Sequence, residues 1–171
     1  MGRARIGLFC QKYMSHTCDA VVISCIDWRL HPYVGMFTHN TYGTIDFISL
    51  AGAVKGLVDE QQNEDLISNI ELSLKLHSPS TIVLTSHRDC GAHGGSAKFE
   101  NDREQEFSHH ARVLGQAEAV IREKFPKLSV VKLFLELDGR NGRWVCIPAD
   151  LSESGFGFDT AAPSRESAEV A

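Results

Sequence analysis

Residues 20–29 read AVVISCIDWR, and this stretch decides the fold. Its first six residues are small or apolar and mostly β-branched, which predicts a buried strand over 20–25. Three further runs of the same kind follow along the chain. They are TIDFISL at 44–50, TIVLTS at 81–86 and SVVKLFL at 129–135.

Helical patterns separate these runs. Apolar residues recur at helical spacing over 60–77 and again over 107–125, where Pro126 ends the second pattern. The turn residues DGRNG at 138–142 predict a hairpin into a last strand at 143–147. Because strands that alternate with helices favour parallel pairing, we expect an α/β fold. It would have a mostly parallel central sheet of about five strands, flanking helices and an antiparallel C-terminal edge strand.

The length and composition fit one globular domain. The chain has 171 residues, of which 43% are hydrophobic and 23% charged, and its net charge is −5. Residues 150–171 hold five acidic side chains against one arginine, so most of the net charge lies there. We expect a single domain over 1–149 and an acidic, flexible tail over 150–171.

Composition also bounds the partners and the compartment. A nearly neutral body without a basic face argues against nucleic-acid binding. No apolar run approaches the ~20 residues that span a bilayer, and none follows the basic residues near the N-terminus, so we expect no membrane span and no secretory signal. Five cysteines without such a signal argue against a disulfide framework and favour reduced thiols in the cytoplasm.

Metal-ligating residues follow two of the predicted strands. The first strand ends in Cys25, and the strand at 81–86 runs into His87 and Cys90. Since active sites collect at the carboxyl ends of strands in open α/β sheets, we expect these side chains to converge. Two thiolates and an imidazole suit Zn²⁺, and three protein ligands leave a fourth position open. The alternatives are a closed structural zinc site completed by Asp27, and a cysteine nucleophile assisted by histidine.

The motifs CIDWR at 25–29 and HRDCG at 87–91 resemble the signature of the β-class carbonic anhydrases. The resemblance covers roughly residues 18–148, and it implies the family's parallel α/β fold and a homodimer or a higher multiple of dimers. It also implies three zinc ligands and a catalytic dyad. The ligands are Cys25, His87 and Cys90, and the dyad is Asp27 with Arg29.

The resemblance further implies zinc-dependent hydration of carbon dioxide to bicarbonate. In such a site a zinc-bound hydroxide attacks the carbon of CO₂. Asp27 would orient the hydroxide, while Arg29 keeps Asp27 ionised and turned away from the metal. If Asp27 leaves Arg29 and becomes a fourth ligand, the site closes, and we expect lower pH to favour this closed state.

The chain departs from the family pattern after its second predicted strand. Many members have arginine and asparagine around an Ala-Gly pair, whereas this chain reads SLAGA at 49–53. The departure keeps open a carbonyl sulfide or carbon disulfide hydrolase, an activity found among relatives of the family, and a non-catalytic zinc-stabilised protein. The substrate-facing glutamine of many members has only Gln11 as a positional counterpart. Candidates for the substrate pocket are Ala51, Gly52 and Gly91.

Turnover of such a site needs a proton carrier, and an exposed histidine is the natural one. The candidates are not ranked by the sequence. A histidine in a loop is expected to face solvent or to form a hydrogen bond with the backbone, and a pair that opens a helix is expected to cap it or to be solvated. The candidates are His31, His93, His109 and His110.

Three thiols and three aromatic side chains have simpler interpretations. The thiols outside the metal motif are expected to be structural, and they are Cys10, Cys18 and Cys146. Some aromatic residues are candidate walls of an apolar cleft, with core packing as the stronger alternative. They are Phe37, Tyr42 and Phe47.

Overall fold

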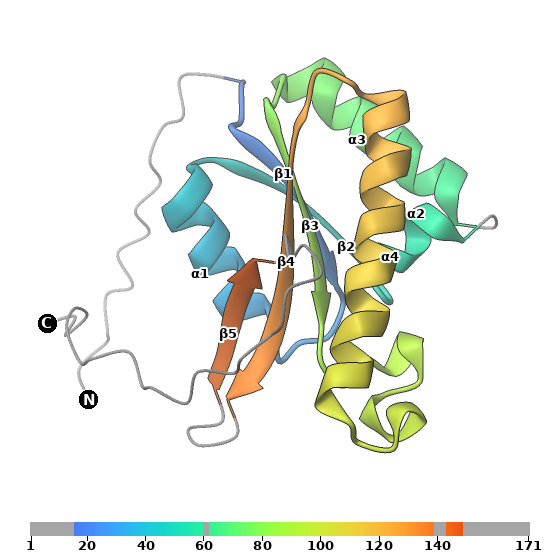
Figure 1. Cartoon of the computed structure of the whole chain (residues 1–171). Coiled ribbons are helices and arrows are strands. Elements are labelled where there is room, and N and C mark those ends of the chain that lie inside the picture. The colour runs from blue at the N-terminus through green and yellow to red at the C-terminus, as the bar shows by residue number, and fades with distance from the viewer. Residues whose placement is uncertain (1–15, 60–61, 139–142, 149–171) are drawn as a thin grey trace, which may run out of the picture.

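The computed structural model describes residues 16–59, 62–138 and 143–148, and the side chains among them up to residue 136. The chain forms a five-stranded sheet in the order β2-β1-β3-β4-β5 (Figure 1). The first four strands pair in parallel, and β5 pairs antiparallel with β4. This confirms the predicted fold class. The strands are β1 (Ala20–Cys25), β2 (Ile45–Leu50), β3 (Thr81–His87), β4 (Ser129–Asp138) and β5 (Arg143–Pro148).

Helices cover both faces of this sheet. Figure 1 shows α2, α3 and α4 on one face and α1 on the other. The two predicted helical patterns correspond to α3 and α4, whereas α1 and α2 were not predicted. The helices are α1 (His31–Tyr42), α2 (Lys55–Val58), α3 (Asn63–His77) and α4 (Arg103–Lys124), and two short 3₁₀ turns, η1 (Gly91–His93) and η2 (Ser96–Phe99), connect β3 to α4.

The hydrophobic core has two layers, one on each face of the sheet. Val21 and Ile23 of β1 pack with the layer under α2, α3 and α4, while Ala20 and Val22 pack with the layer under α1. Because both faces of β1 are covered, every residue of the strand is buried. This burial explains why its sequence is a continuous apolar run with no alternation of polar residues.

Two local signals fix helix ends, the start of α4 near the loop after β3 and the end of α3 at the opposite end of the sheet. The Asp102 carboxylate accepts hydrogen bonds from the backbone N–H groups of Glu104 and Gln105, at 2.9 and 3.0 Å, and so begins α4. Helix α3 ends where Ser78 adopts a left-handed backbone conformation with φ of 51°. The Asp102 cap therefore starts α4 directly after the loop that follows β3.

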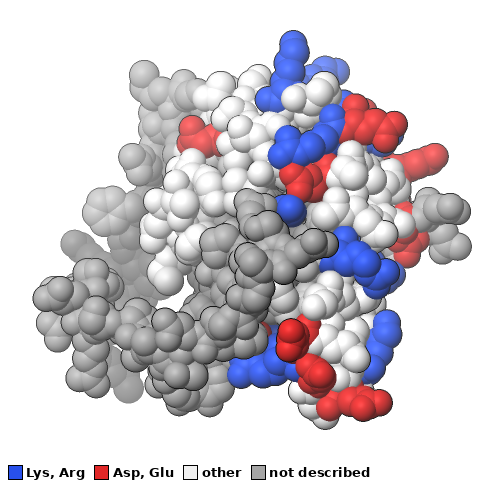
Figure 2. All heavy atoms as spheres, viewed as in Figure 1, with Lys and Arg blue, Asp and Glu red and all other residues white. Residues whose placement is uncertain are grey.

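The parallel register brings the carboxyl ends of β1 and β3 to one edge of the sheet. Cys25 ends β1 opposite Leu50 of β2, and β3 extends to His87 beside it. Positive and negative side chains are interspersed over the helical side of the face in Figure 2. Among the described residues, no helix combines the length and apolarity needed to cross a membrane. The tail predicted at 150–171 lies outside the described residues.

Candidate metal centre

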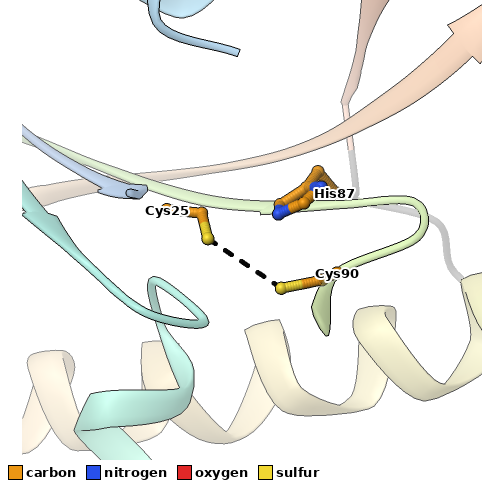
Figure 3. A group of neighbouring side chains, drawn as sticks. All are labelled: Cys25, His87 and Cys90. Atoms are coloured by element: carbon orange, nitrogen blue, oxygen red, sulfur yellow. Dashed lines mark hydrogen bonds between the residues drawn. The ribbon is translucent and has the colours of Figure 1, made fainter. Parts of the chain in front are cut away.

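Three metal-ligating side chains meet at the carboxyl edge of the sheet. Cys25 ends β1, His87 ends β3, and Cys90 lies in the loop behind β3, so that their side chains face one another (Figure 3). All three are buried, and their ligand atoms lie within 4.8 Å of one another. The structure therefore brings together the three residues that the sequence predicts as zinc ligands.

The spacing of the two sulfurs suits a tetrahedral zinc ion. The Sγ atoms of Cys25 and Cys90 are 3.9 Å apart. Two thiolates bound to one tetrahedral Zn²⁺ at ~2.3 Å would lie about 3.8 Å from each other. The residues present thus fit the metal in both their chemistry and their separation.

The histidine is held in the tautomer that a metal requires. His87 Nδ1 lies 2.8 Å from the backbone oxygen of Arg88. Because a carbonyl oxygen only accepts, Nδ1 carries the proton and Nε2 presents its lone pair. Such a bond to the second ring nitrogen is the usual support of a metal-binding histidine.

Only one of the two thiols, that of Cys25, ionises easily in the protein without a metal. The hydrogen bond with Cys90 lowers the pKa of Cys25 well below its usual value, and the backbone N–H of Gly52 supports the sulfur at 3.4 Å. The same hydrogen bond, together with burial, raises the pKa of Cys90. One thiolate therefore forms readily in the protein alone, and the second needs a cation beside it.

The Asp27–Arg29 pair lies on the loop that follows Cys25. Arg29 donates from Nε to both Asp27 carboxylate oxygens at 3.0 Å and from Nη2 to Oδ2 at 2.6 Å. The backbone N–H of Arg29 adds a bond to Oδ1 at 3.0 Å. These bonds lower the pKa of Asp27, so its carboxyl group is ionised at neutral pH. In this structure Asp27 is paired with Arg29 in the arrangement expected of the open state.

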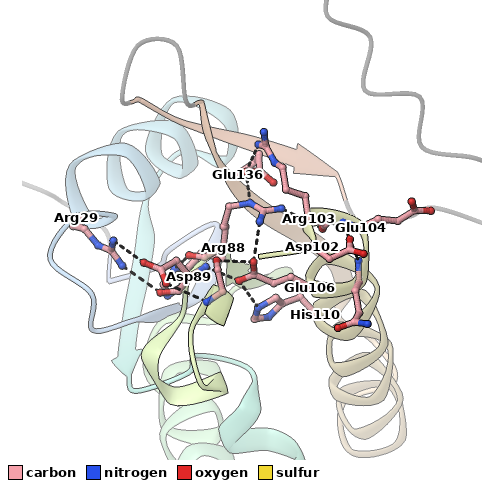
Figure 4. A network of polar contacts seen from close by, with 12 residues as sticks. Arg29, Arg88, Asp89, Asp102, Arg103, Glu104, Glu106, His110 and Glu136 are labelled. Atoms are coloured by element: carbon pink, nitrogen blue, oxygen red, sulfur yellow. Dashed lines mark hydrogen bonds and ion pairs between the residues drawn. The ribbon is translucent and has the colours of Figure 1, made fainter. Parts of the chain in front are cut away.

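A buried ionic network anchors the loop that carries Cys90 (Figure 4). Arg88 Nη1 lies 2.8 Å from Glu106 Oε2, and Arg88 Nε donates to Glu136 Oε1. The two glutamates are only 0% and 4% exposed. Arg103 also lies 2.6 Å from Glu136 and completes the charge balance. Buried charges of this kind are tolerated because each is paired and hydrogen-bonded.

Glu106 joins this network to the loop itself. Its Oε1 accepts from the backbone N–H of Asp89 at 2.7 Å, and its Oε2 accepts from Ser96 Oγ at 2.7 Å. Asp89 in turn lies 3.3 Å from Arg29 Nη1. Polar contacts therefore run from the Asp27–Arg29 pair through the loop to α4. Glu106 is a functional candidate that the sequence motifs do not predict, although its place four residues before His110 on the buried stripe of α4 is a usable signal.

Two of the candidate histidines are buried. His93 is 5% exposed, and its Nε2 lies 3.4 Å from the backbone oxygen of Gly52, so it contacts backbone, which is one of the two environments expected of it. His110 is fully buried within α4, which differs from the expectation that it caps the helix or is solvated. His93 Nδ1 lies 3.0 Å from His109 Nε2, and His110 Nδ1 lies 2.6 Å from Ser86 Oγ. Burial lowers the pKa of His93 to about 4 and that of His110 to about 2. These imidazoles can be buried because they have polar partners and pack against other rings. Those partners come from distant segments, so a single sequence does not reveal them.

His31 has a different environment. It opens α1 directly after the Asp27–Arg29 loop, and it is exposed. Its Nε2 lies 3.2 Å from the backbone oxygen of Cys25. Among the four candidate proton carriers, His31 combines contact with a ligand residue and access to solvent.

The candidate pocket residues take three different positions. Gly52 is buried, and its φ of +79° favours glycine. A Cβ there would lie 3.0 Å from the Cβ of Ala92, so the close approach of the two loops also requires glycine. Gly91 is exposed with open space where a Cβ would point, and Ala51 is exposed.

The remaining sequence candidates pack on the core, are partly exposed or lie outside the described region. Phe37 and Tyr42 pack against the core layer under α1, and Phe47 is 39% exposed. Gln11 and Cys10 lie outside the described residues, and so does the side chain of Cys146 on β5. Cys18 is half-buried at the opposite end of β1.

Solved structures of β-carbonic anhydrases share this fold. The β-carbonic anhydrase isoform I of Trichomonas vaginalis is 14% identical and matches 79% of this chain and 85% of its own, with a TM-score of 0.53. One of two tetrameric β-carbonic anhydrases of the ascomycete Sordaria macrospora is 13% identical and matches 78% of this chain and 82% of its own, also with a TM-score of 0.53.

Comparisons of sequence give the family. An uncharacterised protein of Rickettsia conorii is 33% identical over 129 residues, which cover 71% of this chain and 69% of that protein. A second, from Rickettsia bellii, is 32% identical over 128 residues, 71% of this chain and 78% of that protein. A family model described as "Putative carbonic anhydrase" matches residues 15–143. With that match over most of its length and the β-carbonic anhydrase fold around its Cys-His-Cys cluster, the chain belongs to this carbonic anhydrase family.

Proposed function

We propose that this chain is a zinc-dependent carbonic anhydrase that hydrates carbon dioxide to bicarbonate. The observation that carries the proposal is the meeting of Cys25, His87 and Cys90 beside the hydrogen-bonded Asp27–Arg29 pair. Three ligands leave one position of a tetrahedral zinc ion open for chemistry. A structural zinc site would more often use closely spaced cysteine pairs, whereas Cys25 stands far from Cys90 in the sequence.

Zinc bound by these residues would lower the pKa of water towards ~7 and so supply hydroxide near neutral pH. The protein's own part is orientation and proton transfer. Asp27 accepts a hydrogen bond from the attacking oxygen and turns its lone pair towards CO₂. Arg29 holds Asp27 ionised and away from the metal through the bonds described above.

His31 is the proton carrier of this proposal. It is exposed, and it contacts the backbone of a proposed ligand, so it can pass a proton from the site to buffer. His93 and His110 are poor carriers because burial keeps both imidazoles neutral at physiological pH. His109 reaches the site only through the buried His93.

The chain is further proposed to form a homodimer or a higher multiple of dimers and to work in the cytoplasm. Ile26, Trp28 and Met36 are 56%, 79% and 62% exposed, and among the described residues β2 is an edge strand whose last residue accepts a hydrogen bond from the backbone of Ile26. Exposed apolar side chains together with an edge strand favour a homodimer or a higher multiple of dimers. The similar Sordaria macrospora enzymes are tetrameric. A cytoplasmic location is proposed because the thiols must stay reduced to bind metal.

One experiment tests the activity. Zinc per chain is determined on the purified protein, and CO₂ hydration is followed by stopped-flow on the same preparation. Cys25→Ser should lose both zinc and activity, whereas Asp27→Ala should keep zinc and lose activity. Asp65→Ala, which removes an exposed carboxylate on α3, is the matched control and should change neither. Bound zinc without hydration activity would contradict the proposal.

Carbonyl sulfide and carbon disulfide are assayed beside CO₂ on that preparation. The SLAGA segment at 49–53 lacks the arginine and asparagine of many members, and it borders the proposed site through Gly52. Hydrolysis of either sulfur compound at a higher rate than CO₂ hydration would reassign the substrate while leaving the zinc site intact.

A further inference from the structure

A second group of metal-ligating side chains lies at the other end of the sheet. Cys18 precedes β1, Asp46 lies at the start of β2, and His77 ends α3. Cys18 and Cys25 flank β1, which at ~3.3 Å per residue separates the two groups by about 20 Å. The ligand atoms of Cys18, Asp46 and His77 all lie within 4.8 Å of one another.

The Asp46 carboxylate is the centre of this group. Its Oδ2 lies 2.7 Å from His77 Nδ1 and accepts from Ser73 Oγ at 2.5 Å. The Cys18 thiol donates to the backbone oxygen of Ala20 at 3.6 Å, and its sulfur lies within 4.8 Å of the ligand atoms of Asp46 and His77. A thiol, an imidazole and a carboxylate therefore converge on one point from three separate elements.

Backbone hydrogen bonds hold the three segments together. Cys18 N donates to His77 O at 2.9 Å, and the neighbouring Asp19 N donates to Thr44 O at 2.8 Å. The pairing of Val21 with Asp46 fixes β2 against β1. The group is thus held by secondary structure, and a ligand would meet a largely preformed arrangement.

The group opens into a pocket of about 340 Å³, which gives a cation access from solvent. The side chains of His77 and Asp46 remain 34% and 26% exposed. Two more histidines, His16 and His39, line the same pocket and are available as a fourth ligand. Magnesium and calcium prefer oxygen ligands alone, whereas a thiolate with imidazole nitrogen and one carboxylate suits zinc.

We propose that Cys18, Asp46 and His77 form a second zinc site, separate from the Cys25–His87–Cys90 cluster and completed by a histidine of the pocket. A metal there would link the segment before β1 to β2 and to the end of α3. It would act on the stability of that end of the sheet, far from the proposed catalytic position. The site does not depend on the proposed function, because none of its residues belongs to the other cluster.

Metal content measured on the full chain tests this site. Wild-type protein is dialysed to equilibrium at micromolar free zinc under reducing conditions, and bound metal is determined per chain. We expect two zinc ions for wild type and one for Cys18→Ser and for His77→Ala. Ser73→Ala is the matched control, since it removes a hydrogen bond to Asp46 but no ligand, and it should keep two. A zinc content that is the same in both ligand variants as in wild type overturns the proposal. A wild type with a single zinc that both ligand variants lose would support it and would show instead that the Cys25–His87–Cys90 cluster is empty.

Cobalt identifies the ligand that is lost. In cobalt-loaded wild type, three thiolates contribute to the sulfur-to-metal absorption, and Cys18→Ser should remove about one third of it while leaving the far-ultraviolet circular dichroism unchanged. Unchanged absorption in this variant would show that Cys18, Asp46 and His77 form only a hydrogen-bonded cluster. Loss of activity alone would not bear on this site, so failure of the catalytic proposal and failure of this one are distinguishable.

Discussion

Arg29 decides the state of Asp27, because it makes all of the side-chain hydrogen bonds described for that carboxylate. Arg29→Ala should release Asp27 towards the metal and reduce CO₂ hydration roughly 10- to 100-fold with zinc retained. Stopped-flow rates from pH 6 to 9 and zinc analysis measure both effects. Arg122→Ala, which breaks an exposed ion pair with Glu118 on α4, is the control. A wild-type activity profile that is flat over this range would count against a pH-dependent closed state.

His31 carries the second prediction at this scale. His31→Ala should reduce the maximal rate several-fold in dilute buffer, because proton transfer then relies on water and buffer alone. The value of kcat/KM for CO₂ should change much less, since it reports the chemical step and not the later proton transfer. Added imidazole should restore the variant more than it stimulates wild type. Equal stimulation of both proteins would remove His31 from the proton path.

At the scale of elements, α4 supports the metal loop through Glu106. Removing its charge leaves Arg88 buried with one fewer partner, and breaking such a pair costs about 3–5 kcal/mol. Glu106→Gln should therefore lower the free energy of unfolding by an amount of that order and speed the loss of zinc to a chelator. Urea denaturation and a colorimetric zinc-release assay measure the two effects.

The control for that substitution lies on the same helix. Glu104 is exposed in the first turn of α4, and Glu104→Gln should change stability by less than about 0.5 kcal/mol. If both variants lose the same stability, the buried network does not support the loop.

Elements also show what the sequence can predict. The strands were predictable because burial on both faces leaves the apolar runs AVVI in β1 and IVL in β3. The cluster was predictable because parallel strands bring their carboxyl ends together. Helix α1 was missed because only Val34 and Thr38 are buried on it, which leaves a weak apolar stripe. Buried charges such as Glu106 were missed because their partners come from distant segments.

At the scale of the whole molecule, buried histidines make stability depend on pH. The pKa of His93 is lowered to about 4 and that of His110 to about 2 by burial, against 6.5 as the ordinary value. Below pH ~6.5 the unfolded chain binds protons that the folded protein does not, so stability falls as pH falls. Each histidine contributes at most about 1.4 kcal/mol per pH unit.

The loss of stability caused by the two buried histidines begins below pH ~6.5, above the pH range in which carboxylates titrate. Urea unfolding between pH 7.5 and 5 should show decreasing stability for wild type and a shallower decrease for His110→Gln and for His93→Gln. Zinc loss at low pH affects all three proteins alike, so the comparison isolates the two imidazoles. Slopes identical to wild type in both variants would contradict the effect of burial.

The surface around the free edge of β2 determines the last prediction, which concerns assembly. Trp28 is 79% exposed beside the Asp27–Arg29 pair, and Met36 on α1 is 62% exposed. Large apolar side chains in this position gain free energy when a second copy covers them, at about 25 cal/mol per Å² of apolar surface removed from water. A charge placed among them would oppose that burial without disturbing the core.

Trp28→Glu should therefore shift the protein from dimers or larger assemblies to monomers, measured by light scattering after size-exclusion chromatography over a range of concentrations. Ala119→Glu is the matched control, since Ala119 is exposed on α4, which packs against β3 and β4, and it should leave the assembly unchanged. Because Trp28 adjoins the dyad, the monomer should also lose activity. A wild-type protein that is monomeric at every concentration would exclude this interface and would leave the exposed edge of β2 to be explained by another partner.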